Sequence, residues 1–245
     1  MELSLALTSV SFSQTITDFW GRRLCNGRLL HSDSTFGLTV NPDLEEDSRV
    51  MLLQETDARV MAVVTPQLEN KLGLAGQPVR SIEAFRQRLS EFQVILNGAD
   101  WVFYFSAADK QSLEAERPGG PRKLTAGDQG AFARFQSSAS ERDLDDAWVE
   151  LNHWAVFGAF EQERLVSATS AYPWGGAWIA DIGVLTLEPF RARGHARRLV
   201  RSIGRYALDH GYEPQYRCQI DNDASVALAK AAGLTSFGRW ETVLP

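Results

Sequence analysis

Cysteine and long apolar runs are nearly absent from this chain. Cys25 and Cys218 are its only cysteines in 245 residues, and neither has partners at metal-ligand spacing. The sequence therefore predicts neither a disulfide framework nor a metal site. It contains no run of about 18 apolar residues to span a bilayer, and its first residues lack the basic stretch of a secretory signal. We therefore expect a cytoplasmic protein with no membrane partner.

Positive charge is also in deficit. The chain carries 25 lysines and arginines against 31 aspartates and glutamates, a net charge of −6. This balance argues against a protein that coats nucleic acid nonspecifically. Apolar side chains, in contrast, make up 44% of the residues. They are enough to bury a large core in one or two domains.

A strand, a tight loop and a helix follow one another in the second half of the chain. The apolar run from Ile179 to Leu187 predicts a buried strand, which ends before Pro189 because proline donates no ladder hydrogen bond. Beyond the loop, apolar residues recur at helical spacing: Ala196, Leu199, Val200, Ile203, Tyr206 and Ala207. Gly211 is expected to end this helix.

The loop between the strand and the helix is suited to an anion. Backbone N–H groups lack partners at a helix N-terminus, and the helix dipole favours negative charge there. Gly194 has no Cβ, so a ligand can approach the backbone closely. Arginines crowd the loop and the first helical turns: Arg191, Arg193, Arg197, Arg198, Arg201 and Arg205. The segment therefore predicts a site for a phosphate-rich ligand.

This segment resembles the signature of the GNAT superfamily of acyl-CoA N-acyltransferases, in which a strand is followed by [R/Q]xxGx[G/A] and an amphipathic helix. Arg191, Gly194 and Ala196 occupy the fixed positions. A second stretch, residues 222–225 followed by residues 232–234, is similar to the NxxS…lGF segment of the same family. Two motifs in the expected order are more specific than either alone. The resemblance covers about residues 120–243.

The best linker in the chain lies at residues 114–122, where charges, prolines and glycines cannot build a packed element. We expect two domains, an N-terminal mixed α/β domain of unknown role at residues 1–117 and a GNAT-like domain at residues 118–245. The expected fold class is α/β of the α+β type, with a mixed sheet flanked by helices.

Hydrophobic periodicity predicts the elements of both halves. In the first half we expect helices at 11–25 and 82–92, and strands at 36–40, 49–54, 59–65 and 101–105. In the second half the predicted order is β-α-α-β-β-β-α-β-α-β, which is also the order that the resemblance implies. Its elements include a hairpin of strands 154–160 and 165–172, a strand at 215–220, a helix at 224–231, and a last strand at 236–244 that closes the sheet.

The resemblance also implies where acetyl-CoA, the expected co-substrate, would bind. In the family, the two strands that here end near Leu187 and Ile220 diverge, and the pantetheine lies in the gap. The loop N–H groups would hold the pyrophosphate, and the N–H of Leu187 would meet the developing oxyanion. The implied cofactor contacts are Leu185, Thr186, Leu187, Arg191, Ala192, Arg193, Gly194, His195, Ala196, Arg197, Asn222 and Ser225. For each residue the structural alternative is a solvated helix start or an ordinary turn.

Direct transfer to an amine requires a base, because a protonated amine with a pKa of about 10 cannot attack. Asp181 interrupts an otherwise apolar strand, at the position where a branch of the family carries an acidic base. The alternative is that Asp181 binds an arginine or caps a backbone N–H, and both interpretations stay open. The family's tyrosine acid is replaced by Ala229. Tyr172, Tyr216 or a water could substitute, or the thiolate could leave without an acid.

Two other features are assigned ordinary roles. His31, His153 and His210 have no identifiable partners in the sequence. Residues 141–150, with five carboxylates, are interpreted as a solvated helical face, and the less favoured alternative is the mouth of a site that attracts an amine.

Three functions are compatible with the sequence. The first is an N-acetyltransferase that acts on an amine of a small molecule or an amino-acid-like substrate, either as a monomer or as a homodimer. The second is a catalytically silent acyl-CoA-binding sensor, which the missing tyrosine favours. The third, a dinucleotide-binding Rossmann protein, is disfavoured because GxGxxG is absent and the strands before the loop are predicted to be antiparallel.

Overall fold

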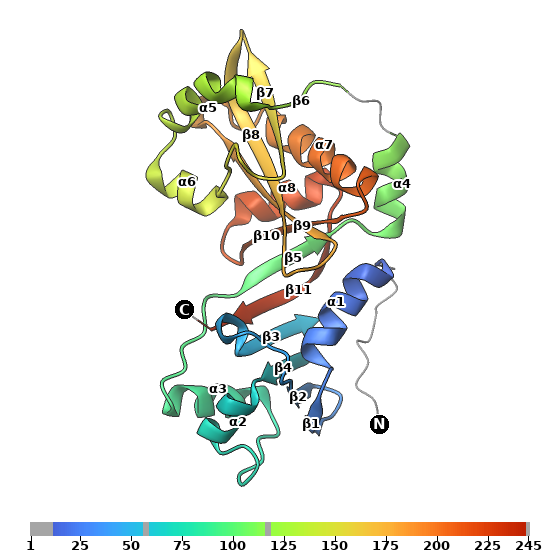
Figure 1. Cartoon of the computed structure of the whole chain (residues 1–245), viewed down its shortest axis with the longest axis vertical. Coiled ribbons are helices and arrows are strands. Elements are labelled where there is room, and N and C mark those ends of the chain that lie inside the picture. The colour runs from blue at the N-terminus through green and yellow to red at the C-terminus, as the bar shows by residue number, and fades with distance from the viewer. Residues whose placement is uncertain (1–11, 56–58, 116–118, 244–245) are drawn as a thin grey trace. The chain divides into compact units, whose positions relative to one another are not determined.

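The computed structural model describes residues 12–55, 59–115 and 119–243, and the chain forms two compact units (Figure 1). The first unit comprises Met1–Val102, Cys218–Asn222 and Ser236–Pro245, and the second comprises Phe103–Arg217 and Asp223–Thr235. The last strand of the chain therefore belongs largely to the N-terminal unit.

The first unit contains a mixed sheet in the order β1-β2-β4-β3-β11. Its strands are β1 (Arg28–Ser32), β2 (Phe36–Val40), β3 (Val50–Glu55), β4 (Val60–Val64) and β11 (Thr235–Thr242). The β2–β4 pair is parallel, and the other pairs are antiparallel. Every residue of β2 and β4 is buried, as expected of strands covered on both faces.

Helices cover both faces of this sheet. Side chains of α2 (Pro66–Leu72) and α3 (Ile82–Glu91) share one apolar core with alternate residues of β2, β3 and β4. Helix α1 (Gln14–Leu24) contacts β4 and buries Ile16, Phe19, Trp20 and Leu24 completely. Side-chain oxygens of Ser13, Thr65 and Ser81 cap the three N-termini by accepting backbone N–H groups.

In the second unit, the strand order is β10-β9-β8-β7-β6. The strands are β6 (Arg122–Lys123), β7 (Ala155–Glu161), β8 (Arg164–Pro173), β9 (Ile179–Thr186) and β10 (Glu213–Gln219). Neighbours pair antiparallel except β9 and β10, which are parallel. Strand β5 (Asp100–Tyr104) and helix α4 (Ala107–Ala115) precede them in the chain.

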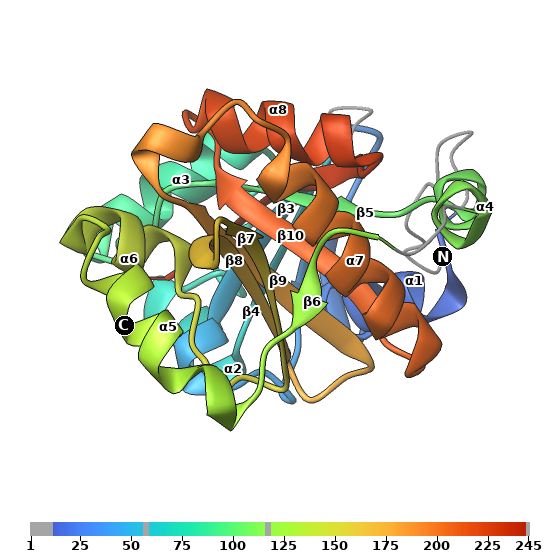
Figure 2. The ribbon, with the colours of Figure 1, turned by 90° about the horizontal axis from the view of Figure 1, so that it is seen from above.

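Two helices contact one face of these strands and a third contacts the other. Helix α5 (Gln129–Gln136) contacts β8 and α6 (Glu141–Ala147) contacts β9, whereas α7 (His195–Asp209) lies on the opposite side (Figure 2). Helix α8 (Asp223–Ala232) packs against α7. Short 3-10 turns precede α5 (η2, Ala126–Asp128) and α7 (η3, Glu188–Phe190), and a third lies before β3 (η1, Glu46–Ser48).

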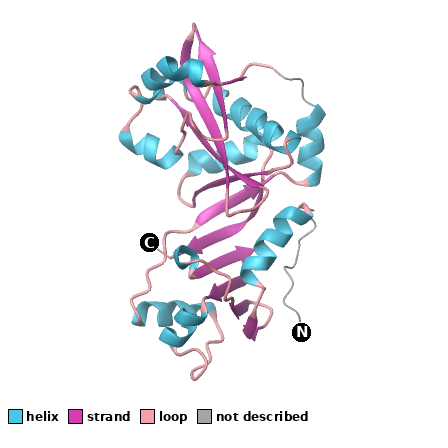
Figure 3. Cartoon of the chain, viewed as in Figure 1, coloured by secondary structure: helices cyan, strands magenta, loops and turns pink. Residues whose placement is uncertain are grey.

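The predicted order of elements beyond residue 118 is confirmed. The structure has β6-α5-α6-β7-β8-β9-α7-β10-α8-β11, and Figure 3 shows this mixture of helices and strands. One detail was wrong. The last strand was expected to close the sheet of the second half, but β11 pairs with β3 of the first unit, from Gly238↔Glu55 to Thr242↔Met51.

Three elements of the first half were not predicted. Helix α2 was missed because Pro66 was read only as the end of a strand, although proline also suits the first turn of a helix. Strand β1 is partly exposed and lacks clear alternation, and α4 lies beside the linker composition at 114–122. Part of that linker, residues 116–118, is outside the described residues, and the domain boundary near residue 118 stays a prediction. None of the described helices is long and apolar enough to cross a membrane.

Candidate functional site

Strands β9 and β10 separate partway along their length. Their parallel register runs from Ile179↔Glu213 to Ile182↔Tyr216 and then stops, although β9 continues to Thr186 and β10 to Gln219. Strand β9 stays paired with β8 up to Thr186. The backbone of β9 beyond Ile182 is therefore paired on one side only.

Alternation along β9 decides which backbone groups face the separated side. The N–H of Leu187 donates to the carbonyl of Val166 at 3.0 Å, on the β8 side. Residues two apart face the same neighbour, so Leu185 also faces β8, and its carbonyl accepts from Ser167 Oγ. Val184 and Thr186 face the other way. The predicted oxyanion role of the Leu187 N–H is therefore corrected, because that group is already used in the sheet.

The loop after β9 leads to an N-terminus of α7 that no side chain caps. Ala192 and Gly194 both adopt left-handed conformations, with φ of 61° and 78°. Gly194 is the N-cap residue, and no side chain hydrogen-bonds to the first turn there. The first helical bond runs from the N–H of Arg198 to the carbonyl of Gly194. The N–H groups of His195, Ala196 and Arg197 therefore begin the helix without intrahelical acceptors.

The turn of the β7–β8 hairpin braces this loop from one side. Glu161 accepts from Arg193 at 3.0 Å and is hydrogen-bonded to His195 Nε2 at 2.7 Å. The hydrogen bond with His195 and the charge of Arg193 lower the pKa of Glu161. The guanidinium groups of Arg164 and Arg193 lie over the ring of Phe190, 5.4 and 5.1 Å from its centroid. His195 and Arg193 thus contribute backbone to the loop, while their side chains hold it in place.

Arg191 and Arg197 are the other two arginines predicted to contact the cofactor, and only the side chain of Arg191 is engaged within the described part of the chain. Arg191 donates to the carbonyl of Thr186 at 3.1 Å and to Asp143 of α6 at 3.0 Å, so its side chain ties the loop to β9 and α6. Arg197 is exposed in the first turn of α7, and no residue of the described ranges pairs with its guanidinium. Of the two guanidinium groups expected to reach a phosphate, that of Arg197 is the uncommitted one.

The second motif begins α8. Asn222 precedes the helix and donates its backbone N–H to the carbonyl of Gln219, and Ser225 lies in the first turn. Ala229, at the family's tyrosine position, is completely buried. A side chain at that position therefore points into the protein interior.

Asp181 is the centre of a buried polar network. Tyr172, its cross-strand partner in β8, donates to Oδ2 at 2.8 Å, and Gln215 of β10 donates to Oδ1 at 2.9 Å. Arg217 donates from Nε and Nη2 to both oxygens, at 3.1 and 2.7 Å. Gln215 in turn accepts from the hydroxyl of Tyr104. Of the two interpretations left open by the sequence, binding to an arginine is the arrangement observed.

The environment of Tyr172 also affects its suitability as an acid. Burial, with the neighbouring carboxylate of Asp181, raises the pKa of its hydroxyl above the usual value. A phenol that already donates to a carboxylate and holds its proton more tightly is a poor proton donor to a thiolate.

An aromatic cluster adjoins this network on the α6 face of the sheet. The rings of Trp148, His153 and Tyr172 lie together, with centroids 4.6 to 5.1 Å apart. His153 Nδ1 is hydrogen-bonded to Ser170 Oγ of β8 at 2.8 Å. Gly183, opposite Ser170, leaves no room for a side chain, because a Cβ there would lie 2.1 Å from the carbonyl oxygen of Ala147.

Sequence reasoning missed both His153 and Arg217. His153 reaches Ser170 only through the hairpin register, in which Val156 pairs with Ser170. Arg217 reaches Asp181 only because β10 is parallel to β9 in a register that no local pattern encodes. The alternation of Gln215 and Arg217 on β10 was the one available signal.

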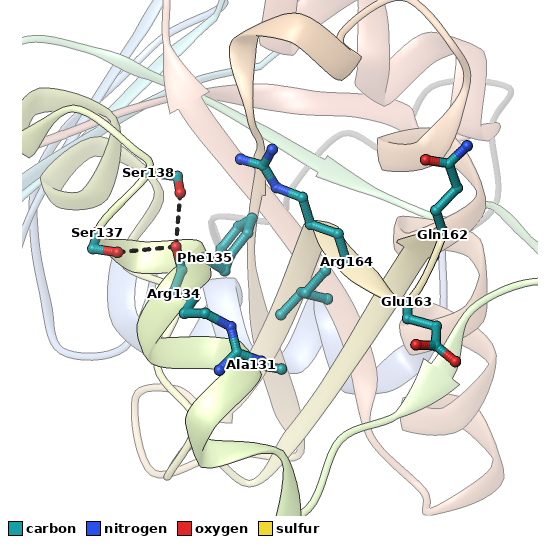
Figure 4. A pocket seen from close by; sticks show the side chains of 9 residues that line it. Ala131, Arg134, Phe135, Ser137, Ser138, Gln162, Glu163 and Arg164 are labelled. Atoms are coloured by element: carbon teal, nitrogen blue, oxygen red, sulfur yellow. Dashed lines mark hydrogen bonds between the residues drawn. The ribbon is translucent and has the colours of Figure 1, made fainter.

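A pocket of about 390 Å³ lies at the turn of the β7–β8 hairpin, beside the C-terminal end of α5 (Figure 4). It is lined by Ala131, Arg134, Phe135, Ser137, Ser138, Gln162, Glu163, Arg164 and Leu165. The hydroxyls of Ser137 and Ser138 both donate to the carbonyl of Arg134 and so complete the helix end. The pocket contains none of the predicted site residues.

Metal ligation is not suggested by the described residues. Across 12–55, 59–115 and 119–243, no group of three or more His, Cys, Asp or Glu side chains is placed to hold a metal ion.

Comparisons with known proteins agree with this geometry. A sequence profile of the Acetyltransferase (GNAT) family matches residues 127–234. Among solved structures, a GNAT-family acetyltransferase from Colwellia psychrerythraea is similar with a TM-score of 0.52 and 15% identity, over 78% of this chain and 79% of that one. A GNAT-family protein from Novosphingobium aromaticivorans is similar with a TM-score of 0.48 and 15% identity, over 61% of this chain and 64% of that one. A search of curated protein sequences found no significant match.

The aligned region spans less than two thirds of the length of the Novosphingobium protein. At 15% identity, the similarity to the Colwellia psychrerythraea protein shows the fold alone. The profile match, in contrast, includes the β9–loop–α7 segment and the start of α8. Residues 127–234 therefore belong to the GNAT acetyltransferase family.

Proposed function

We propose that this protein is an N-acyltransferase that transfers the acetyl group of acetyl-CoA directly to an amine of a small molecule or an amino-acid-like substrate. The observation that carries the proposal is the uncapped N-terminus of α7, which follows the left-handed Gly194 directly after the separated end of β9. Membership of residues 127–234 in the family supports acyl transfer in general.

The loop supplies the cofactor contacts in this proposal. The N–H groups from Ala192 to Ala196 hold the pyrophosphate, whereas that of Arg191 already donates to the carbonyl of Glu188. The guanidinium of Arg197 adds a charge-assisted contact. Asn222 and Ser225, which flank the start of α8, are the contacts that the second motif predicts. The side chains of Arg191, Arg193 and His195 brace the loop, so Arg193 and His195 contact the cofactor through their backbone in this proposal.

The pantetheine lies along β9 as an added strand. Its amides pair with Val184 and Thr186, whose backbone groups face away from β8, rather than with Leu185 and Leu187. One of these two N–H groups polarises the thioester carbonyl and stabilises the oxyanion. Asp181 lies earlier in β9, where it accepts hydrogen bonds from Arg217, Gln215 and Tyr172 and so holds these side chains in position.

The first experiment is thermal unfolding with acetyl-CoA, CoA or NAD at about 1 mM. A ligand at about 100 times its Kd stabilises the folded state by about 2.7 kcal/mol, which is several degrees for a domain of this size. We expect a shift with acetyl-CoA and CoA and none with NAD. A shift with NAD alone would contradict the proposal in favour of a dinucleotide site.

Arginine variants locate the site. Arg197→Ala is expected to weaken acetyl-CoA binding about tenfold, because it removes one charge-assisted phosphate contact. The matched control is Arg142→Ala on α6, whose side chain is 88% exposed and pairs only with Asp146 among the described residues. Equal affinities for the two variants would exclude a contact between the guanidinium of Arg197 and the phosphates.

A second candidate function is an acyl-CoA sensor without catalysis. Two observations favour it, the buried Ala229 at the family's acid position and the engagement of Asp181 by Arg217. Thiol release from acetyl-CoA in the presence of an amine panel separates the two functions. Binding without release for every amine would establish the sensor, and any amine-dependent release would exclude it. The homodimer considered from the sequence stays a prediction, which the molecular mass in solution tests.

A further inference from the structure

We propose that His153 is the general base that deprotonates the acceptor amine, and that the aromatic cluster of Trp148, His153 and Tyr172 is the acceptor side of the active site. This inference rests on the proposed acyl transfer. It assigns a role to a histidine that the sequence treats as ordinary and replaces Asp181 as the base.

The first step is that Asp181 is fully engaged. Its two oxygens accept from Arg217, Gln215 and Tyr172, and its side chain is 8% exposed. A carboxylate held by a guanidinium and two neutral donors has no lone pair directed at an incoming ammonium group. It can orient its neighbours, but it is badly placed to accept a further proton.

The second step concerns the two ring nitrogens of His153. Nδ1 is hydrogen-bonded to Ser170 Oγ, and within the described part of the chain Nε2 has no hydrogen-bond partner. When Nδ1 donates to the hydroxyl oxygen, the lone pair of Nε2 becomes the available base. The rings of Trp148 and Tyr172, each 5.1 Å from the imidazole, fix its orientation.

The third step is position. Ser170 is the cross-strand partner of Gly183, the first residue of β9 beyond its pairing with β10. The next residue, Val184, directs its backbone toward the separated side, where the thioester is proposed to lie. His153 is therefore level with the reacting carbonyl along the strand, on the face covered by α6. From there it can reach an amine directly or through one water.

Burial, rather than a neighbouring charge, keeps His153 neutral. Burial lowers the pKa of His153, and the carboxylate of Glu150 opposes this only in part. On the sheet side it faces the neutral hydroxyls of Ser170 and Tyr172, beyond which the charges of Asp181 and Arg217 neutralise each other. A base with a pKa below the usual value of about 6.5 is unprotonated at neutral pH.

The chemistry balances with these groups. The acceptor ammonium group gives one proton to Nε2 of His153, which later passes it to solvent, and the neutral nitrogen bonds to the carbonyl carbon of the thioester. The tetrahedral intermediate loses its second N–H proton as the C–S bond breaks. The leaving CoA thiolate takes up a proton, and the products are an amide and CoA.

The acceptor side also indicates a class of amine. Trp148 ends α6 and is 53% exposed beside the site, and the same helix carries the exposed carboxylates of Glu141, Asp145 and Asp146, of which Asp146 is paired with Arg142. An aromatic surface near negative charge suits a protonated amine with an apolar or aryl substituent. Phenethylamine is therefore a suitable probe.

The test uses bromoacetyl-CoA, whose reactive carbon takes the place of the acetyl methyl group. The Nε2 lone pair displaces bromide, a C–N bond forms, and the proton on Nδ1 is lost to solvent. We expect one adduct per chain on His153, located by peptide mass spectrometry and prevented by acetyl-CoA. His153→Gln should abolish the adduct and keep the CoA-induced thermal shift, whereas His210→Gln, at the far end of α7, should label like the wild type.

Kinetics provide a second readout. With phenethylamine, His153→Gln should lower kcat/KM by about 100-fold or more, with little change in the KM for acetyl-CoA. In the wild type, kcat/KM should fall on the acid side with a pKa below about 6.5, and this limb should disappear in the variant. Adducts on other residues, or an unchanged acid limb in His153→Gln, would overturn the assignment. If CoA and acetyl-CoA give no thermal shift at all, the proposed function itself fails, which is a different result.

Discussion

The role of a carboxylate can change completely with its partners, and Asp181 is an example. From the sequence it was a polar residue in an apolar strand, equally suited to catalysis and to pairing. The structure pairs it with Arg217 at 2.7 Å. The pattern of one strand could indicate that a carboxylate was buried, but only the register between β9 and β10 could identify its partner.

We therefore predict that Asp181→Asn is mainly a stability defect. The substitution keeps the shape and removes the charge, so the guanidinium of Arg217 is left without its counter-charge in a largely buried position. The expected cost is about 2 kcal/mol, or roughly 5 °C in Tm. The acid limb of kcat/KM should persist, because the base is His153. An unchanged Tm together with a lost acid limb would instead make Asp181 the base.

At the scale of elements, α7 has a left-handed glycine at each end, and this allows a matched comparison. Gly194 has φ of 78° at the start of the helix, and Gly211 has φ of 79° just beyond its end. A Cβ at Gly211 would meet nothing within 4 Å, and one at Gly194 would lie 3.5 Å from Arg198 Nη1. The strain of an L side chain is therefore nearly the same at the two sites.

Gly194→Ala and Gly211→Ala should each cost about 1 kcal/mol, because alanine is disfavoured in the left-handed region. Only Gly194→Ala should also weaken the binding of acetyl-CoA, because the added methyl group would lie where the pyrophosphate approaches the backbone. Urea unfolding gives the two stabilities, and isothermal titration calorimetry gives the two affinities. Equal affinities for equally destabilised variants would show that the glycine serves only the helix start.

For the whole molecule, the sequence predicted the second half well and the first half less well, for physical reasons. Helix α7 and strands β8 and β9 have strong local periodicity, and they were found nearly to the residue. Strand β11 was also found, but its partner was not. Its pairing with β3 joins residues 183 to 191 positions apart, from Gly238↔Glu55 to Thr242↔Met51. The side chains of Trp240 and Phe237 face the ring of Trp20. Such pairings depend on tertiary packing, which local patterns do not contain.

This pairing predicts that a cut at residue 118 will not yield a stable C-terminal domain. A fragment of residues 118–245 would keep β11 but lose β3, so the strand would lose its ladder from Gly238 to Thr242 and the partner of Glu241, Arg86. Its unpaired edge and the uncovered ring of Trp240 would favour association. We expect the fragment to aggregate or to unfold well below the full chain, measured by size-exclusion chromatography and thermal unfolding. A monomeric fragment with the Tm of the full chain would support an independent domain that begins at 118. It would also show that β11 does not depend on the first unit.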